Sequence, residues 1–474
     1  MTEFYIYDLE TWGIDPKRDR IAQFAGVRLD PELNIKEDGL TLYCQLAPDY
    51  LPDPQSMLIT GISVQTCQQK GLTEHQFCQT IHQQFSQSPV CVLGYNNIRF
   101  DDEMLRYAFY RNFIEPYGRE WQHGNSRWDL LDVVRACYAL RPEGIEWPTK
   151  DDGSVSFRLE DLTKANQLTH AKAHDAMSDV LATAAVAKLI AQQQPRLFQY
   201  LFAHRTKQAL MPMIDVAGLT PLVHVSGMFP AAQGCISWVV PLAFHPTQKN
   251  AVICFNLQQD PDLLADIDVD TLRQRLYSRT DDLAADELRP ALKLVHLNKC
   301  PILAPAKTLS AERAEQLGID RTACLRHLER LKQNKDLRQR LVEIYQQAQE
   351  YPSETNPDYA LYQGFISAKD QQLLQDIQQA APEQLVGLEP LFQDDRLNAL
   401  WPRFLARNYP HLLSHQQQQQ WRDYCVNKLR YGEDQPPRTV DELMLMIENI
   451  MESHGDQEKV RSLMHKFYQH VTSC

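Results

Sequence analysis

Short apolar runs alternate with helical patterns over the first 190 residues, and this alternation limits the folds that the chain can adopt. Phe4–Tyr7 and Val90–Tyr95 have the length and apolar character of strands. Residues 175–192 instead have helical spacing and many alanines. Strands that alternate with helices predict an α/β layer structure. We therefore expect an α/β fold for this part of the chain.

Two polar breaks divide the rest of the 474 residues. The first, at 192–195, ends a helical pattern with three glutamines and a proline, and the second, at 351–357, contains two prolines. Between them lie strand-like runs such as Ile236–Val240 and Ala251–Phe255, whereas the pattern after residue 311 is helical. At roughly 150 residues per domain, these breaks predict three domains. Their expected bounds are 1–190, 195–350 and 355–474.

Composition narrows the class of protein. A net charge of −13 would by itself argue against a polyanion partner, but the charge is −9 over residues 1–190, +2 over 191–350 and −6 over 351–474. The sequence contains no run of about 18 apolar residues, so it predicts no membrane span. The N-terminus lacks a signal-peptide pattern, and the eleven cysteines include no CxxC pair. We expect a cytoplasmic protein with reduced thiols and no membrane partner.

A pair of carboxylates ends the first strand-like run. Asp8 and Glu10 are two residues apart, so on a strand they point to the same face, at an end where open α/β sheets place ligand sites. Like charges this close repel each other unless a cation lies between them, and paired carboxylates suit Mg²⁺ or Mn²⁺. The pattern is short and common, so two solvated acids are the alternative.

A second acidic segment follows the strand-like run at 90–95. Its residues, 94–103, read as a strand end, a Gly/Asn turn and acids that open a helix. Asp101 and Asp102 are equally placed by spacing to join the first carboxylate pair. Acids in a first helical turn are also favoured by the helix dipole without any metal.

The third segment, 174–179, precedes the alanine-rich helix. His174 and Asp179 are five residues apart and would not share a face of a regular helix. If His174 lies on the loop before the helix, both side chains can point into one cleft. The alternative makes Asp175 or Ser178 a helix cap and His174 a surface residue.

Together the three segments place four acids and one histidine in the order DxE, D, HxxxxD. With this order the chain resembles the DEDDh group of 3′→5′ exonucleases and, within it, the bacterial exonuclease I family. The resemblance implies an RNase H-like exonuclease domain, an SH3-like β-rich domain and an α-helical C-terminal domain. It covers the first two domains strongly and the last more loosely. It also rests on residues 125–132, 139–145, 157–160, 162–166, 222–229 and 297–301.

The resemblance implies a catalytic chemistry for these residues. Two Mg²⁺ ions, for which Mn²⁺ is a possible substitute, clamp the attacking and leaving oxygens of an in-line displacement at phosphorus. His174 fits the general base, since imidazole titrates near neutrality. The pattern favours Asp101 over Asp102 and Asp179 over Asp175. The implied metal ligands, which with His174 form the catalytic set, are Asp8, Glu10, Asp101 and Asp179.

Aromatic and basic residues interleave between residues 106 and 158. Stacking platforms and guanidinium groups suit a single strand, whose bases are free to stack, although such side chains also fill cores and cover helices. Arg158 is the strongest candidate for a phosphate contact, and Thr11 would meet the terminal nucleotide. The substrate-binding residues that the resemblance implies are Glu10, Thr11, Arg106, Tyr117, Trp121, Arg135, Arg141, Arg158, Tyr200 and Lys207.

A second basic cluster, at 321–340, holds seven cationic residues against two acids. It reads as a solvated helix face, a phosphate track or a dock for an acidic peptide. Members of the exonuclease I family bind the acidic C-terminal tail of the single-stranded-DNA-binding protein, so the resemblance makes this cluster a candidate for that partner.

The predicted function is processive 3′→5′ hydrolysis of single-stranded DNA to 5′-mononucleotides in DNA repair and recombination, by a monomer. One alternative is a 3′→5′ exoribonuclease, against which the two accessory domains argue. A second is a non-catalytic single-strand-binding module, which the intact set of four acids and a histidine opposes.

Overall fold

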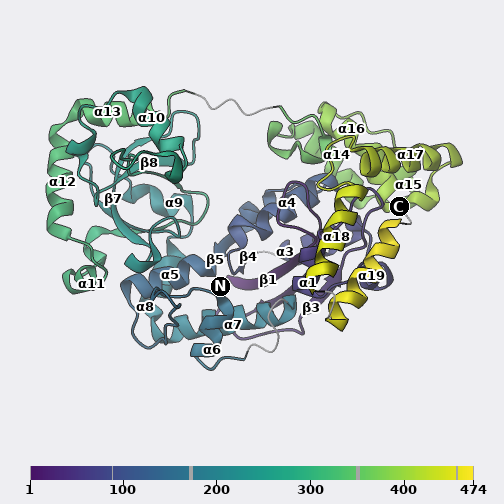
Figure 1. Cartoon of the computed structure of the whole chain (residues 1–474), viewed down its shortest axis with the longest axis horizontal. Coiled ribbons are helices and arrows are strands. Elements are labelled where there is room, and N and C mark those ends of the chain that lie inside the picture. Colours follow the sequence, from purple (N-terminus) through teal and green to yellow (C-terminus); the bar gives the residue numbers. More distant parts are fainter. Residues whose placement is uncertain (1, 88, 170–174, 348–352, 455–456, 473–474) are drawn as a thin grey trace. The chain divides into compact units, whose positions relative to one another are not determined.

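The computed structural model describes all residues except 1, 88, 170–174, 348–352, 455–456 and 473–474 (Figure 1). The chain forms two compact units. Unit 1 comprises residues 1–126, 170–184 and 352–474, and unit 2 comprises residues 127–169 and 185–351. Because the C-terminal segment is one compact body with the first segment, these units do not follow the domain bounds that the sequence suggests, and those bounds stay a prediction.

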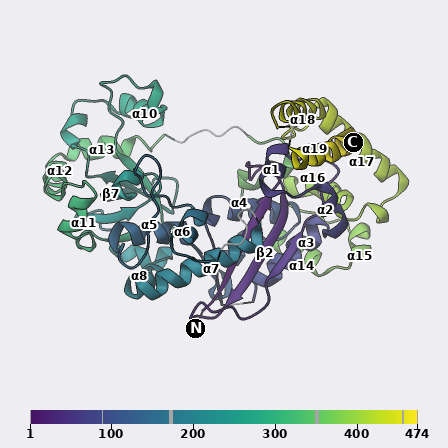
Figure 2. The same cartoon turned by 60° about the horizontal axis from the view of Figure 1, so that its bottom comes forward.

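A mixed five-stranded sheet in the order β3-β2-β1-β4-β5 carries the N-terminal acids. Its central strand, β1 (Glu3–Thr11), pairs antiparallel with β2 (Ile21–Leu29) and parallel with β4 (Val90–Gly94). The outer strands are β3 (Leu40–Tyr43) and β5 (Ser126–Asp129). Figure 2 shows the purple strands of this sheet side by side. The α/β architecture expected for this part is confirmed.

The apolar residues of β1 and β2 explain why these strands lie at the centre of the sheet. All nine residues of β2 are buried, as expected of a strand covered on both faces. Helices α3 (Glu74–Phe85) and α4 (Asp101–Arg111) contribute Phe85 and Phe109 to a core that also holds Tyr7 and Phe24.

The C-terminal segment is helical, as the sequence predicts, and it completes a second core of unit 1. Trp12 and Leu51, which follow β1 and β3, share this core with Ile447 of α18 and Phe467 of α19. The remaining helices of this unit are α1 (Pro54–Thr60), α2 (Val64–Lys70), α14 (Ala368–Gln379), α15 (Pro382–Gly387), α16 (Asp395–Asn408), α17 (His415–Tyr431), α18 (Val440–His454) and α19 (Glu458–Thr472), with α7 (Ala176–Gln193) entering it through its first turns.

Buried ion pairs join the C-terminal helices to the N-terminal part of unit 1. The Arg407 guanidinium donates to both carboxylate oxygens of Asp49, at 3.0 and 2.7 Å, and to both of Asp358, at 2.5 and 2.8 Å. Lys428 Nζ lies 2.7 Å from Asp49 Oδ2. Burial alone would raise the pKa of Asp49, but the charges of Arg407 and Lys428 hold that pKa well below its usual range. The cations therefore compensate both buried carboxylates.

A buried histidine marks another contact between the same segments. The His75 backbone N–H donates to Asn408 Oδ1 at 2.8 Å, and the ring nitrogens lie 2.6 Å from Tyr409 Oη and 3.2 Å from Gln378 Oε1. Burial lowers the pKa of His75 to about 4, against the hydrogen bond to Gln378 Oε1, which raises it. The folded chain therefore holds this imidazole neutral.

We expect His75 to make folding sensitive to mild acid. Its pKa is about 4 in the folded chain and about 6.5 in the unfolded chain, which takes up the proton first. Its contribution to stability is complete above about pH 6.5 and is lost as pH falls toward 4, reaching a loss of about 2 kcal/mol at pH 5. Urea unfolding should show that stability falls less between pH 7 and pH 5 in His75→Gln than in the wild-type chain, by about 2 kcal/mol. The exposed His465 supplies a control, His465→Gln, which should keep the wild-type pH dependence.

Unit 2 contains an antiparallel five-stranded sheet in the order β10-β6-β7-β8-β9, which confirms the predicted β-rich region. The strands are β6 (Leu222–Val225), β7 (Ile236–Phe244), β8 (Ala251–Asn256), β9 (Leu292–His296) and β10 (Ile302–Pro305). Its helices are α5 (Leu130–Leu140), α6 (Leu159–Ala165), α8 (Pro195–Ala203), α9 (Lys207–Leu210), α10 (Val269–Tyr277), α11 (Ala311–Gln316), α12 (Arg321–Gln333) and α13 (Lys335–Glu343).

Two further sequence features can be examined in the described ranges. None of the helices there is both long enough and apolar enough to span a membrane. The cysteines in those ranges carry free thiols, and all but Cys425 are buried.

Candidate active site

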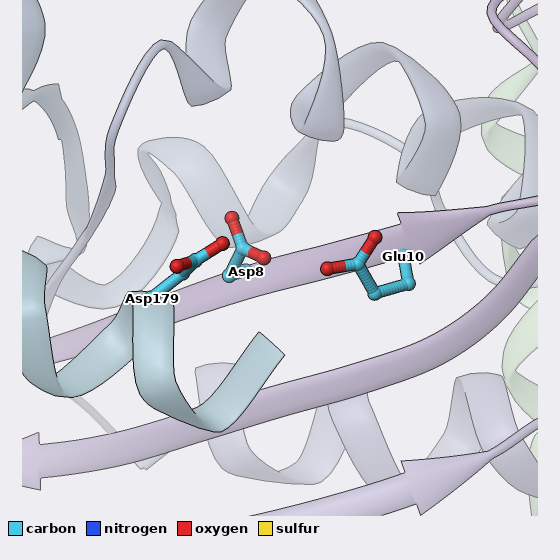
Figure 3. Close-up of side chains that lie close together, drawn as sticks. All are labelled: Asp8, Glu10 and Asp179. Atoms are coloured by element: carbon cyan, nitrogen blue, oxygen red, sulfur yellow. The ribbon is translucent and has the colours of Figure 1, made fainter. Parts of the chain in front are cut away.

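Three carboxylates converge where β1 ends and α7 begins (Figure 3). Asp8 and Glu10 project from the same face of β1, and Asp179 projects from the first turn of α7. One oxygen of each lies within 4.8 Å of the others. The donor set consists only of carboxylate oxygens, which hard divalent cations such as Mg²⁺ and Mn²⁺ prefer. The residues present therefore fit the divalent metal that the sequence predicts.

Asp101 adds a fourth negative charge to this site. It opens α4 and is buried, with 6% of its surface exposed. Burial raises the pKa of Asp8 well above its usual range, and the charges of Asp101, Glu10 and Asp179 raise it further. Asp101 is thus close enough to Asp8 to act on it electrostatically, although it lies outside the group of three within 4.8 Å. Such a cluster is a site for a cation.

The structure distinguishes the roles of Asp101 and its neighbour Asp102, whereas sequence spacing alone does not show which of the two joins the carboxylate group. Asp102 is fully buried, and its Oδ1 accepts hydrogen bonds from the Tyr7 hydroxyl at 2.6 Å and from Arg119 Nη2 at 2.8 Å. Neither Tyr7 nor Arg119 stands in a sequence pattern that indicates this role. Tyr7 and Arg119 therefore engage the Asp102 carboxylate in hydrogen bonds, whereas the charge of Asp101 acts on Asp8.

The structure also distinguishes the role of Asp179 from that of Asp175. Asp175 Oδ1 accepts a hydrogen bond from the Ser178 backbone N–H at 3.2 Å, which is a capping contact at the start of α7. His174 lies outside the described residues, so its role as general base stays a prediction.

The turn that delivers Asp101 depends on a glycine. A Cβ on Gly94, the last residue of β4, would lie 2.9 Å from the Tyr7 backbone oxygen and from the Asn97 Cβ. Asn96 then adopts a left-handed φ of 67°, which asparagine tolerates better than most residues. This close approach brings the start of α4 beside β1.

The predicted DNA contacts in unit 1 differ in how available they are. The Trp121 side chain is 67% exposed. Arg106 is buried, and its guanidinium binds both carboxylate oxygens of Glu120 at 2.9 and 2.8 Å. It also lies 5.4 Å from the Tyr117 ring centre. Thr11 Oγ1 donates to the Gly13 carbonyl at 2.8 Å. Arg106 and Thr11 therefore have internal partners, and DNA contact stays a prediction for all four.

The predicted DNA contacts in unit 2 also comprise exposed residues and residues that have partners within the unit. The Arg158 side chain is 74% exposed, with one ion pair, to Glu160, at 4.0 Å. The other four each contact their own unit. Arg135 pairs with Asp132 at 2.7 Å, Arg141 Nη1 donates to the Thr308 carbonyl at 3.4 Å, the Tyr200 hydroxyl donates to the Leu303 carbonyl at 3.3 Å, and Lys207 Nζ donates to Asn250 Oδ1 at 2.7 Å.

An α/β fold that carries a cluster of carboxylates suited to divalent cations fits the class that the sequence predicts, the metal-dependent exonucleases with an RNase H-like fold. Comparison with known families agrees. The exonuclease family model matches residues 5–187, the exonuclease I SH3-like domain matches residues 205–347, and the exonuclease I C-terminal domain matches residues 355–474.

Curated relatives and solved structures match almost the whole chain. Exodeoxyribonuclease I of Haemophilus influenzae is 46% identical over 98% of both chains, and that of Escherichia coli is 48% identical over 97% of this chain and 96% of the relative. The structure of E. coli exonuclease I in complex with a dA16 oligonucleotide covers 100% of both chains with a TM-score of 0.95 and 45% identity. The chain therefore belongs to the exodeoxyribonuclease I family, and it is an enzyme of the phosphodiester hydrolase class.

Proposed function

We propose that the chain removes nucleotides from the 3′ end of single-stranded DNA as 5′-mononucleotides, with Mg²⁺ as its metal and Mn²⁺ as a substitute. The convergence of Asp8, Glu10 and Asp179, with Asp101 beside them, carries this proposal. The E. coli relative has been solved with single-stranded oligonucleotides and in a zinc-bound complex with single-stranded DNA, which supports both the substrate and a divalent metal.

The residues of the site have distinct tasks in this function. The four carboxylates would hold the ions, and their fixed positions on β1, α4 and α7 keep mutually repelling charges together. Once bound, divalent ions lower the pKa of water and neutralise charge on phosphate oxygens. His174 is proposed to take the proton of the attacking water. Without a cation, the charge of this cluster repels a phosphodiester.

Matched oligonucleotides test the proposal. With Mg²⁺, a 3′-labelled single strand should release labelled mononucleotide at once, whereas a 5′-labelled strand should keep its label on shortened products. Chelation of the metal should stop both, and duplex DNA should be a poor substrate. Faster trimming of the matched RNA would favour an exoribonuclease, and binding without any release would favour a strand-binding module. Adding excess unlabelled strand after the start would test processivity, because a processive enzyme finishes the strand that it holds.

Arg158 is the predicted phosphate contact that the structure leaves most exposed. We expect Arg158→Ala to weaken binding of single-stranded DNA about tenfold and to reduce the slope of log affinity against log salt by about 0.7, because one phosphate contact is lost. Anisotropy titrations of a labelled strand in EDTA, at several salt concentrations, measure both quantities. Arg461→Ala removes another exposed arginine and should leave the slope unchanged. An unchanged slope in Arg158→Ala would exclude this contact.

We also propose that the basic cluster at 321–340 binds the acidic C-terminal tail of the single-stranded-DNA-binding protein, and that the chain acts as a monomer. A solved structure of SSB/exonuclease I in complex with an inhibitor, 44% identical to this chain, supports such a partner. Several cations of the cluster have partners within unit 2: Arg321 lies 5.1 Å from the Trp238 ring centre, and Arg330 binds Asp260 at 2.5 Å. Exposed Arg326 is a better candidate for the peptide.

Charge reversal at Arg326 tests this assignment. We expect Arg326→Glu to weaken binding of a labelled acidic peptide about tenfold, through the loss of one charge contact and the gain of a repulsive one. Its single-stranded-DNA cleavage should not change. Peptide binding at wild-type strength would place the tail elsewhere. Sedimentation of the wild-type chain at a mass above that of one chain would contradict the monomer.

A further inference from the structure

A buried hydrogen-bond network lies directly behind the metal-binding acids. Asp102 Oδ1 accepts from the Tyr7 hydroxyl at 2.6 Å and from Arg119 Nη2 at 2.8 Å. The exposed fractions are 1% for Tyr7, 0% for Asp102 and 3% for Arg119. Hydrogen bonds to a buried charge are stronger than neutral ones, and their geometry is well defined. This network therefore forms a rigid connection between β1, α4 and the segment after α4.

The shorter of the two hydrogen bonds joins Tyr7 to Asp102, and each of these residues is adjacent in sequence to a metal-binding acid. Tyr7 precedes Asp8 on β1, and successive strand residues point to opposite faces of the sheet. Asp102 follows Asp101 in the first turn of α4, where successive side chains point in different directions. The Tyr7–Asp102 bond on one side thus fixes the spacing of the two backbones that carry Asp8 and Asp101 on the other.

The surroundings of this network hold it in place. The Phe85 ring meets the Tyr7 ring edge-on, with centres 5.4 Å apart, and lies 5.1 Å from the Arg119 guanidinium carbon. The Tyr7 ring also stacks on Phe24 at 6.0 Å. Both donors to Asp102 are therefore fixed by the same aromatic core, and neither can turn away from the carboxylate without disturbing it.

Repulsion among the acids gives this connection a function. The charges of Glu10, Asp101 and Asp179 oppose the charge of Asp8, so before a cation binds, electrostatic repulsion favours separation of β1 from α4 at this point. A bond that opposes this separation keeps the acids at the spacing that a cation requires.

We propose that Tyr7, Asp102 and Arg119 are positioning residues that hold Asp8 and Asp101 at metal-binding distance, a role which rests on the metal binding proposed above for those acids. Supporting groups of metal ligands commonly change metal affinity by tenfold or more when they are lost. This network supports the ligands through their backbones instead of touching them. Its loss should therefore weaken metal binding more than it changes the reaction at saturating metal.

Tyr7→Phe gives the sharpest test, because it removes one hydroxyl and keeps the ring that packs on Phe24 and Phe85. We expect Mn²⁺ to bind the full-length variant about tenfold more weakly than the wild type, measured without DNA by calorimetry or by the free Mn²⁺ signal in electron paramagnetic resonance. Cleavage of single-stranded DNA should fall at limiting Mg²⁺ and recover toward the wild-type rate at high Mg²⁺. Asp102→Asn, which removes the charge but keeps the shape, should weaken Mn²⁺ binding at least as much.

The chain offers a matched control on the same strand face. Tyr5, two residues before Tyr7, is also buried and also contacts Phe24 and Phe85. Tyr5→Phe should bind Mn²⁺ like the wild type. Wild-type Mn²⁺ affinity in Tyr7→Phe and Asp102→Asn, or equal weakening in Tyr5→Phe, would overturn the positioning role while leaving the metal site standing. Absence of Mn²⁺ binding to the wild-type chain would overturn both.

Discussion

Replacing Asp8 with alanine should lower the rate of mononucleotide release by at least about 10³-fold, equivalent to about 4 kcal/mol of transition-state stabilisation. Asp8 shares the 4.8 Å group with Glu10 and Asp179, and it is also subject to the charge of Asp101. Its loss removes a ligand from this group and the carboxylate on which the other three charges act. Single-turnover cleavage of a 3′-labelled strand in Mg²⁺ measures the effect.

Strand binding should survive the same substitution. The cations predicted to contact DNA, Arg158 foremost, are not part of the carboxylate group, so anisotropy in EDTA should give an affinity close to that of the wild type. Asp38→Ala, which removes an exposed acid from the same unit, controls for the loss of one negative charge and should cleave normally. Undiminished release by Asp8→Ala would refute the metal assignment.

Replacing Arg407 with methionine should lower the free energy of unfolding by about 3–5 kcal/mol, because it leaves two buried carboxylates without their main cation. Arg407 provides two hydrogen bonds to each of Asp49 and Asp358, both of which are fully buried. Lys428 contacts Asp49 and offsets only part of the loss. Urea unfolding of the full chain near neutral pH measures the change.

The difference in the free energy of unfolding between the wild type and Arg407→Met should depend on pH, and this dependence provides an internal check. The pKa of Asp49 and of Asp358 is held low in the folded chain by Arg407 despite burial, so the stabilising contribution is present above the unfolded value near pH 4 and is lost as pH falls below it. The gap between wild type and Arg407→Met should therefore narrow below about pH 4. Arg330→Met breaks an ion pair whose arginine is 45% exposed, and it should cost less than about 1 kcal/mol. A similarly small cost for Arg407→Met would contradict the role of the network.

Strand periodicity was enough to predict that Asp8 and Glu10 share a face, because that relation is local. Which of Asp101 and Asp102 belongs to the carboxylate group cannot be predicted from local sequence. It depends on Tyr7, 95 residues before Asp102, and on Arg119, 17 residues after it. Resemblance to a family favoured Asp101, and the structure adds the physical reason, which is that Asp102 has buried partners.

The association of the two ends of the chain could not be predicted from the sequence. Composition and spacing suggested a separate helical domain after residue 355, because a helical pattern reports which face is apolar and not what covers it. Asp49 and Arg407 are 358 residues apart, and no local pattern marks a buried ion pair over that distance. Exposure decided which predicted DNA contacts have internal partners: Arg106 and Arg158 look alike in sequence, yet one is buried against Glu120 and the other is solvated.

The core shared by Trp12, Ile447 and Phe467 has a consequence for synthesis of the enzyme. Trp12 lies directly after the strand that carries Asp8 and Glu10, but the helices that cover it, α18 (Val440–His454) and α19 (Glu458–Thr472), are synthesised much later. A nascent chain already contains every acid of the site while the apolar surface beside that strand is still open to water. This core of unit 1 can therefore close only after translation has delivered α18 and α19.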